Sequence, residues 1–417
     1  MDFPFVLLFL ASIGATVAAM PLARILGAKV GLLDHPHERK LQSAAVPRTG
    51  GIGIFAGLAA GALVLIELSG DLGVPITREV VAILVGGALI HLTGVLDDLL
   101  DLPAVGKFLA QIVAVGLVIA NGVLLERIEL PGGFVWSLGW LAVPATAFFL
   151  LGFINSVNLV DGLDGLASGI AVVAGLALGL TGVLEGNYLL ASLGTILFGA
   201  VLGFLPFNFA RKKTFLGDAG SMLIGYLIAV IAIAGTRFSG ESTSVFVALA
   251  CGVVPILDTA TTIARRARNG RGIFEADAMH IHHRMIRFGL SPRRTVLVIL
   301  ALTLFSAGQC LVFFVDGTRL LTVSTSLAAV LILLQMRFRH RRVREENGDA
   351  TFHEIVLYLL GAQDGRYPHL DGKVALADVI ASGPASPAGI ETSTLASSPV
   401  ASEVVLEVVD VAGPAAD

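Results

Sequence analysis

Residues 80–101 read VVAILVGGALIHLTGVLDDLLD, a long run without formal charge that ends in three aspartates. An apolar helix of roughly 20 residues crosses the hydrocarbon core of a bilayer, because each residue adds about 1.5 Å. Ionised side chains are costly to bring near that core. The stretch therefore predicts a transmembrane helix whose last turn carries Asp97, Asp98 and Asp101 to one membrane surface.

The rest of the chain repeats this pattern. Of its 417 residues, 55% are hydrophobic and 14% are charged, and the mean hydropathy is +0.85, which is outside the usual balance of soluble domains. The short alternating strands of a transmembrane barrel are not evident. We predict an all-α, polytopic membrane protein with about eleven transmembrane helices. These begin near Phe3, Gly50, Val80, Phe108, Leu141, Leu166, Leu189, Ser221, Ser244, Thr295 and Leu320.

Three further features narrow the class of protein. The first apolar run has no basic residue before it and is followed by Arg24, which favours a retained helix over a cleaved signal peptide. Cys251 and Cys310 both fall inside predicted spans, so we do not expect a disulfide framework. The net charge of −4 gives no indication of a nucleic-acid partner, and we expect none.

The basic residues predict the orientation. If the amino terminus lies outside, all but four of the 28 lysines and arginines fall in loops on the inner side. Such an excess marks the cytoplasmic face of a membrane protein. The exceptions are Arg78, Arg127, Arg237 and Arg319. The carboxyl terminus and every polar motif described below are then predicted to be cytoplasmic.

Composition also divides the chain after residue 337. The run RFRHRRVR, which begins at Arg337, is typical of a basic anchor beside a last span. From Ala381 onward, Ser, Pro and Ala dominate and aromatic residues are scarce, which predicts disorder. We therefore predict a transmembrane domain over residues 1–337 and a cytoplasmic, partly disordered tail over residues 338–417.

Two aspartate-rich motifs suggest chemistry. On a helix, Asp97 and Asp101 share a face, where like charges repel unless a cation or a shared proton offsets them. A solvated helix end is the alternative for this motif. The motif NSVNLVDGLDG spaces its amides and acids three apart, so a helix would align four of them in one stripe, whereas a loop would use them in turns. These four residues are Asn155, Asn158, Asp161 and Asp164.

Two further motifs could bind ions. In FLGDAGS, Asp218 precedes an apolar run, where it could ligate a hard cation such as Mg²⁺ or, like Ser221, act as a helix N-cap. In HIHHR, three histidines precede Arg284, a set that could bind zinc or a diphosphate or could form a solvated loop. The absence of matching cysteines favours the anion.

These motifs converge on one predicted membrane surface and combine acids, amides, glycines and basic groups. That inventory suits phosphoryl transfer, in which positioning and charge neutralisation carry most of the catalysis. The acids that end residues 80–101 would then hold Mg²⁺ or accept a proton where a lipid phosphate meets a soluble nucleotide.

In their order along the chain, LDDLLD, NSVNLVDGLDGLA, FNFARKKTFLGDAGS and HIHHR resemble motifs of the polyprenyl-phosphate N-acetylhexosamine-1-phosphate transferases. The resemblance covers residues 1–337. It implies ten or eleven transmembrane helices, dependence on Mg²⁺ with Mn²⁺ as an alternative, a UDP-N-acetylhexosamine donor and undecaprenyl phosphate as acceptor. The reaction would release UMP and start a cell-envelope glycan at the bacterial inner membrane, with a homodimer as one assembly.

The resemblance also assigns roles by position. Asp97 would be the base that deprotonates the lipid phosphate, and Asp218 would be the principal Mg²⁺ ligand, with Asp98 as a second. Asn208 and Phe215 would contact uracil. The remaining catalytic positions are Asp98, Asp161, Asp164, His282 and His283. The remaining substrate-binding positions are Arg39, Lys40, Arg48, Asn158, His280 and Arg284, of which the first three belong to a basic phosphate-binding loop that departs from many relatives at Gln42.

Two alternatives remain open at this stage. The branch that transfers phospho-N-acetylmuramoyl-pentapeptide usually reads His-His-His at the last motif, so HIHH favours a UDP-N-acetylglucosamine branch. A transporter would also contain acids within a helical membrane domain, but it would place them near the middle of the bilayer. The predicted position of the acids at one surface favours an enzyme.

Overall fold

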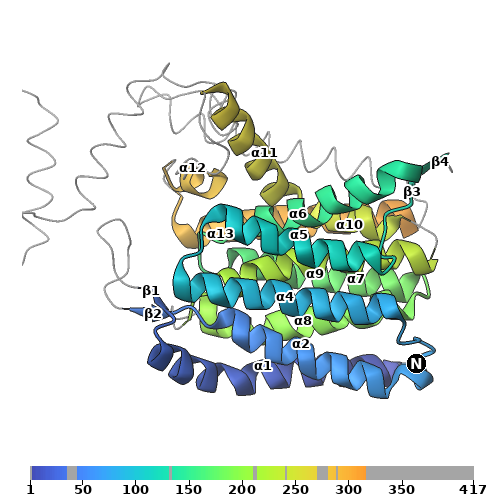
Figure 1. Cartoon of the computed structure of the whole chain (residues 1–417), viewed down its shortest axis with the longest axis horizontal. Helices are drawn as coiled ribbons and strands as arrows, with labels where there is room; N and C mark the ends of the chain where they lie inside the picture. The colour runs from blue at the N-terminus through green and yellow to red at the C-terminus, as the bar shows by residue number, and fades with distance from the viewer. Residues whose placement is uncertain are drawn as a thin grey trace, which may run out of the picture. The chain divides into compact units, whose positions relative to one another are not determined.

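The computed structural model describes residues 2–34, 45–130, 134–209, 214–239, 242–269, 280–287 and 290–315. All of them lie within one unit of the chain, Met1–Ala362 (Figure 1). The long helices are α1 (Asp2–Val30), α2 (Gly50–Glu67), α4 (Arg78–Leu100), α5 (Ala104–Ala120), α6 (Ala142–Val160), α7 (Leu166–Leu184), α8 (Tyr188–Phe209), α9 (Asp218–Ser239), α11 (Val253–Arg268) and α13 (Pro292–Val315). Shorter helices are α3 (Ser69–Leu72), α10 (Thr243–Cys251), α12 (Ile281–Arg287) and a 3₁₀ turn at Gly139–Leu141.

The prediction of a polytopic helical membrane protein is confirmed. Within the described residues, eight helices are long and apolar enough to cross a membrane, and a bent pair of helices raises this number to nine. The segment predicted from Phe108 forms α5, which at 17 residues is shorter than a full span. The segment predicted from Leu320 and the proposed division after residue 337 lie outside the described residues.

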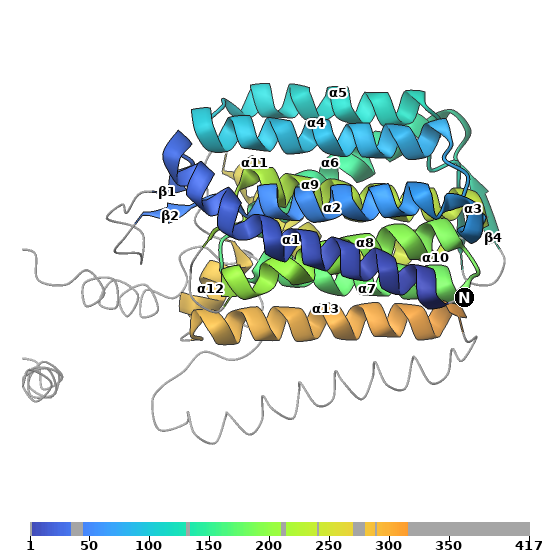
Figure 2. The same cartoon turned by 90° about the horizontal axis from the view of Figure 1, so that it is seen from below.

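Helix α9 is the central element of the bundle. It packs against α2, α4, α6, α7, α8 and α10, and almost all of its length is buried (Figures 1 and 2). A helix enclosed by protein on every side has no solvated face, which explains why its sequence from Met222 to Ala234 contains no charged residue.

Two glycines bring α2 and α4 onto the first turn of α9. A Cβ atom on Gly94 would lie 2.3 Å from the Cα of Ala219, and one on Gly51 would lie 2.4 Å from the backbone nitrogen of Gly220. Only a residue without a side chain allows backbones to approach so closely. The ends of α4 and α9 that carry the aspartate motifs are therefore held next to each other.

The span predicted from Ser244 is divided into two helices that together are long and apolar enough to cross a membrane. Helices α10 and α11 meet at Gly252 with a bend of 66°. Helix α11 buries polar residues and exposes an apolar one, the opposite of a helix in a soluble protein. Asp258 and Thr262 are buried, while Leu257 is 52% exposed. A helix with this pattern directs polar groups inward and apolar groups outward, as expected where it borders lipid on one side and a polar site on the other.

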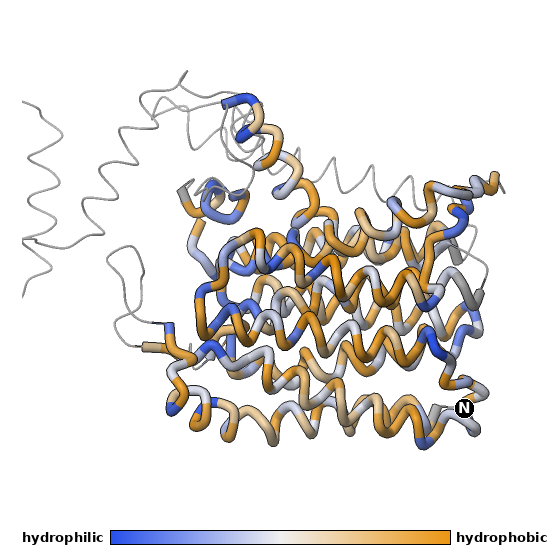
Figure 3. The backbone as a smooth tube through the Cα atoms, in the orientation of Figure 1, coloured by the Kyte–Doolittle hydropathy of each residue, from blue (hydrophilic) through white to orange (hydrophobic). Residues whose placement is uncertain are grey.

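Two short antiparallel hairpins mark opposite ends of the helices. Strands β1 (Leu33–Asp34) and β2 (Val46–Pro47) pair at one end, and β3 (Arg127–Leu130) and β4 (Phe134–Ser137) pair at the other (Figures 1 and 2). Trp136 of the second hairpin and the nearby Trp140 are 51% and 83% exposed. Exposed tryptophans are typical of the boundary between membrane and water. Hydrophobic residues dominate the helix lengths and hydrophilic residues gather toward their ends (Figure 3).

Candidate active site

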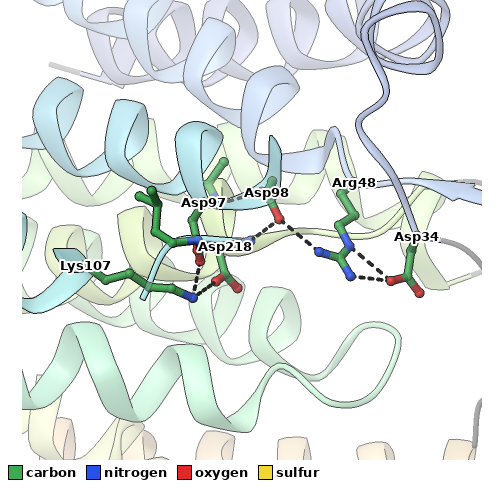
Figure 4. A network of polar contacts seen from close by, with 8 residues as sticks. Asp34, Arg48, Asp97, Asp98, Lys107 and Asp218 are labelled. Carbon is green, nitrogen blue, oxygen red and sulfur yellow. Dashed lines mark hydrogen bonds and ion pairs between the residues drawn. The ribbon is translucent and has the colours of Figure 1, made fainter. Parts of the chain in front are cut away.

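The end of the bundle that carries β1 and β2 gathers carboxylates from two helices. Asp97 and Asp98 occupy the last turn of α4, and Asp218 is the first residue of α9 (Figure 4). The carboxylate of Asp98 accepts hydrogen bonds from the backbone N–H groups of Asp218 and Ala219, at 3.1 and 3.0 Å. Helix starts leave such N–H groups without partners, so Asp98 caps α9 from a neighbouring helix.

The segment before α9 leaves room for this cap. Gly217 adopts a φ of +74°, and a Cβ atom there would lie 2.5 Å from Oδ2 of Asp98. Both the backbone conformation and the close approach require glycine. The N-cap role that the sequence allowed for Asp218 or Ser221 is filled by other groups: Asp98 accepts the N–H groups of Asp218 and Ala219, and the carbonyl of Gly217 accepts those of Gly220 and Ser221.

A lysine that the sequence analysis did not identify completes the centre of the cluster. The Nζ atom of Lys107, in the first turn of α5, forms an ion pair with Asp97 and lies 3.1 Å from Oδ2 of Asp218 (Figure 4). A cation between two carboxylates offsets the repulsion between Asp97 and Asp218. The available signal was its position, since Lys107 is the single basic residue between the ends of two apolar segments.

The three aspartates differ in how much they are exposed. The side chains of Asp97 and Asp98 are 3% and 1% exposed, whereas that of Asp218 is 33% exposed. Asp97 also accepts a hydrogen bond from the backbone N–H of Leu102 at 2.9 Å. Of the three carboxylates, Asp218 is therefore the most accessible to a ligand.

Arg48 extends the cluster toward the first hairpin. It follows β2 and pairs with Asp34 of β1 through Nε, at 3.2 Å, and through a second nitrogen, while its Nη1 lies 3.9 Å from Asp98 (Figure 4). Burial disfavours its charge, but Asp34, Asp98 and Asp218 outweigh this effect and raise the pKa of Arg48 above its ordinary value. Asp34 was not among the predicted site residues, and the predicted Arg39 and Lys40 lie outside the described residues.

The motif NSVNLVDGLDG combines a helix with a turn. Helix α6 ends at Val160, so the predicted stripe of four polar residues on one helix is wrong for its last two members, Asp161 and Asp164. Asp161 is only partly exposed. Its poor solvation, followed by the charges of Asp218, Asp98 and Asp164, raises the pKa of its carboxyl well above the ordinary value. The turn therefore adds two acids to the neighbourhood of the cluster.

The two residues expected to contact uracil have clear structural contacts. The buried amide of Asn208 accepts hydrogen bonds from the backbone N–H of Gly165, at 2.6 Å, and from the Ser168 hydroxyl, and it donates to the carbonyl of Thr214 at 3.1 Å. The backbone of Phe215 bonds to Pro47 and Gly50, at 2.8 and 2.9 Å, and its side chain is partly exposed. Both residues thus join loops that are far apart in sequence.

The histidine motif approaches the same turn from α12. His282 is 1% exposed, and a Cβ atom on Gly162 would lie 2.4 Å from its Nε2 atom. The pKa of His282 is lowered to about 3, chiefly by burial and then by the charge of His283. His283 is exposed, whereas Arg284 is buried. The motif therefore presents a neutral buried imidazole against Gly162.

Zinc and magnesium differ in the number of protein ligands that they need. In the part of the chain that the structure describes, no three His, Cys, Asp or Glu side chains are arranged to hold a metal ion. Magnesium commonly takes one or two protein carboxylates together with phosphate oxygens, a requirement that the accessible Asp218 can meet.

Comparisons with known proteins agree on one family. The sequence model of glycosyl transferase family 4 matches residues 80–236. The chain is 35% identical over 297 residues to a probable undecaprenyl-phosphate N-acetylglucosaminyl 1-phosphate transferase of Bacillus subtilis, covering 70% of this chain and 80% of the relative. It is also 35% identical over 321 residues to a decaprenyl-phosphate N-acetylglucosaminephosphotransferase of Mycobacterium tuberculosis, covering 70% and 79%. An Escherichia coli undecaprenyl-phosphate alpha-N-acetylglucosaminyl 1-phosphate transferase is 31% identical over 293 residues, covering 68% and 77%.

Proposed function

This chain belongs to glycosyl transferase family 4, and we propose that it transfers N-acetylglucosamine 1-phosphate from UDP-N-acetylglucosamine to a polyprenyl phosphate, releasing UMP. The names of the relatives support N-acetylglucosamine 1-phosphate as the transferred group and undecaprenyl or decaprenyl phosphate as the acceptor. The UDP-linked donor and a role at the start of cell-envelope glycan synthesis are parts of the proposal. The observation that carries the proposal is the cluster of Asp97, Lys107 and Asp218 at the ends of apolar helices. Such a cluster suits a reaction between a membrane-anchored phosphate and a soluble nucleotide.

The acceptor side of the reaction needs a proton acceptor and positive charge. We assign the first role to Asp97, whose carboxylate is oriented by Lys107 and by the N–H of Leu102. Asp97 would take the proton of the lipid phosphate, and the freed phosphate oxygen would attack the β-phosphorus of the UDP-sugar. The new P–O bond forms as the bond to the α-phosphate oxygen breaks, and UMP leaves with that electron pair. Arg48 and Lys107 supply positive charge beside the reacting phosphates.

A lipid phosphate is a competent nucleophile, so no enzyme ester is required. Single displacement therefore assigns Asp97 the role of a base. A covalent phospho-sugar adduct formed from UDP-sugar without lipid would instead indicate double displacement.

We assign the magnesium site to Asp218, the accessible carboxylate of the cluster. The metal, when bound, neutralises charge on the diphosphate. Both oxygens of Asp98 accept backbone N–H groups of α9 and so hold Asp218 in place. Each oxygen retains a further lone pair, with which Asp98 would serve as the second magnesium ligand. Mn²⁺ has similar oxygen ligands and is the expected substitute.

The donor would lie toward the 161–165 turn and the histidines. We assign the diphosphate and sugar to Asp161, Asp164, His280, His282, His283 and Arg284, and the uracil side to Asn158, Asn208 and Phe215. Asn208 would act by holding the turn against the segment before α9, since its amide already bonds to both. Arg39 and Lys40 remain assigned to phosphate binding on the sequence alone.

The orientation of the chain is part of the proposal. Arg48 and Lys107 contact the acid cluster, while Arg78 starts α4 at the opposite end. The excess of basic residues supports a cytoplasmic site in a bacterial inner membrane. UDP-sugars would then reach the site from the cytoplasm.

The test is a reconstituted transfer reaction. Purified protein in lipid nanodiscs is supplied with Mg²⁺, undecaprenyl phosphate and radiolabelled UDP-N-acetylglucosamine, and both labelled lipid and UMP are measured. We expect one UMP for each lipid product. UDP-N-acetylmuramoyl-pentapeptide is compared under identical conditions, and a preference for it would place the chain in the peptidoglycan branch. Movement of substrate without formation of UMP would favour a transporter.

A further inference from the structure

Asp258 is a buried carboxylate that none of the roles above uses. It lies on α11, six residues beyond the Gly252 break, and is 3% exposed. An ionised group at this depth must be compensated by hydrogen bonds or charge, since burial without partners is costly. The hydrogen-bond partners of Asp258 lie in the histidine motif.

Both oxygens of Asp258 contact the start of the histidine motif. Oδ2 lies 2.9 Å from Nδ1 of His280, and Oδ1 accepts a hydrogen bond from the backbone N–H of Ile281 at 2.7 Å. One carboxylate therefore fixes a ring and the backbone beside it. These contacts join the bent span to α12 across residues 270–279.

The contact to His280 has a chemical consequence. A carboxylate accepts hydrogen bonds, so Nδ1 must carry the proton that it shares with Asp258. In the neutral ring, Nε2 is then an unprotonated acceptor, and in the charged ring it is a donor. Because Asp258 holds Nδ1, the nitrogen that His280 can offer to another partner is Nε2.

The orientation of His280 is transmitted to His282. The two rings are nearly parallel, with an angle of 2° and centroids 5.8 Å apart. His282 in turn rests on Gly162, next to Asp161. The order of contacts therefore runs from Asp258 through the two histidines to the turn that follows α6.

His282 itself carries a second observation that points to a ligand. It is 1% exposed, yet neither of its ring nitrogens has a hydrogen-bond partner within the described residues. Buried polar groups are nearly always hydrogen-bonded, so an unmet imidazole at this position indicates that a bound molecule supplies the partner. The oxygen-rich diphosphate and sugar of the donor have this chemistry.

We propose that Asp258 is the positioning residue of the histidine motif: it holds His280 in the Nδ1–H tautomer and fixes the start of α12, so that His282 meets the sugar-diphosphate donor. The inference rests on the proposed function for the identity of the donor. Its structural half concerns only the tautomer of His280 and can be tested without turnover.

The Asp258→Asn variant distinguishes an effect on the tautomer of His280 from an effect on the packing of α11. The amide has the same shape, and its oxygen can still accept from Ile281, but its NH₂ group must donate to Nδ1 and so requires the opposite tautomer of His280. Asp258→Glu retains the acceptor chemistry with a longer side chain. Thr261→Ala is the matched control, because the Thr261 hydroxyl donates to the backbone carbonyl of Asp258, at 3.0 Å on the same helix, and not to its carboxylate.

The experiment has two readouts on full-length protein in nanodiscs. Nitrogen-15 NMR of labelled histidine, with the His280 signals assigned by their loss in His280→Gln, should show protonated Nδ1 in wild type and Thr261→Ala but protonated Nε2 in Asp258→Asn. Transfer kinetics should show that Asp258→Asn lowers kcat/KM for the UDP-sugar roughly tenfold or more without changing KM for the lipid phosphate. Asp258→Glu should recover part of the loss.

The outcomes are distinguishable. An unchanged His280 tautomer in Asp258→Asn, or an equal loss in Thr261→Ala, would overturn the inference. So would wild-type kinetics in Asp258→Asn. If wild-type protein forms no lipid product from UDP-N-acetylglucosamine, the proposed function fails, while the NMR comparison still decides whether Asp258 sets the tautomer.

Discussion

Asp98 at the end of α4 accepts the backbone N–H of Asp218 at the start of α9, at 3.1 Å, although 120 residues separate them in sequence. The two residues thus belong to one unit in which a buried carboxylate fixes the position of an accessible one. We predict that Asp98→Ala lowers the free energy of unfolding by about 1 to 2 kcal/mol, the usual cost of losing a charged helix cap, and sharply reduces transfer.

The measurements are the thermal unfolding midpoint in detergent and the initial rate of lipid product formation. Asp101→Asn is the matched control, because Asp101 is exposed and its φ of +47° is tolerated by asparagine. Equal unfolding midpoints for Asp98→Ala and wild type would contradict the capping role.

Lys107 lies between two carboxylates, and its removal should affect chemistry more than folding. We predict that Lys107→Met lowers kcat about 100-fold, since it removes a positive charge beside the reacting phosphates. The site also becomes more negative, so the half-saturating concentration of Mg²⁺ should fall. Rates measured across a Mg²⁺ titration test both effects. Lys107→Arg keeps the charge and should retain more activity, and a Met variant as active as the Arg variant would exclude the role.

Asp218 is the ligand that we assign to magnesium. Asp218→Asn should nearly abolish transfer while leaving the protein folded, because the loss of electrostatic stabilisation at a metal-bound phosphate is worth on the order of several kcal/mol. The test compares transfer with saturating Mg²⁺ and with Mn²⁺, alongside the unfolding midpoint. Near-normal activity at saturating metal would refute the assignment.

Gly162 supports the ring of His282, so a methyl group there should displace the ring. We predict that Gly162→Ala lowers kcat/KM for the UDP-sugar roughly 10- to 100-fold, since small displacements of a binding group are costly to catalysis. Gly152→Ala on α6 is the control, because a Cβ atom there meets nothing within 4 Å. A similar loss in both variants would indicate a general effect of alanine rather than contact with His282.

The buried His282 should make stability depend on pH. Its pKa is lowered to about 3 by burial and the charge of His283, from an ordinary value near 6.5. Between these values the unfolded chain binds a proton that the folded chain does not, so the stabilisation is complete above pH 6.5 and is lost as pH falls. His282 should thus cost about 2 kcal/mol between pH 7 and pH 5.

This dependence is measured from the unfolding midpoint across that pH range. Replacing His282 with glutamine should flatten the curve, because glutamine does not titrate. A His282→Gln variant with the same slope as wild type would show that other groups cause the loss of stability.

The sequence by itself determined the membrane architecture and the set of motifs. The uncharged run that ends at Asp97 could only form a membrane helix, because its length and composition match the bilayer and its acids must reach a surface. The four motifs and their order were also sufficient to predict the family, since specific residue types at fixed spacings are local properties of a chain. Both predictions depend on neighbouring residues alone.

The tertiary structure decided the partners of those residues. Asp34 and Asp258 do not stand out in the sequence, and Lys107 is distinguished only by its position, because each acquires its role from a contact with another segment. The clearest case is the contact of Lys107 with Asp218, which lies 111 residues away along the chain. The cap that Asp98 provides depends on Gly94, which lets α4 lie against the first turn of α9. Hydrophobic periodicity sets which segments enter the membrane, but van der Waals packing between helices sets which charged ends meet.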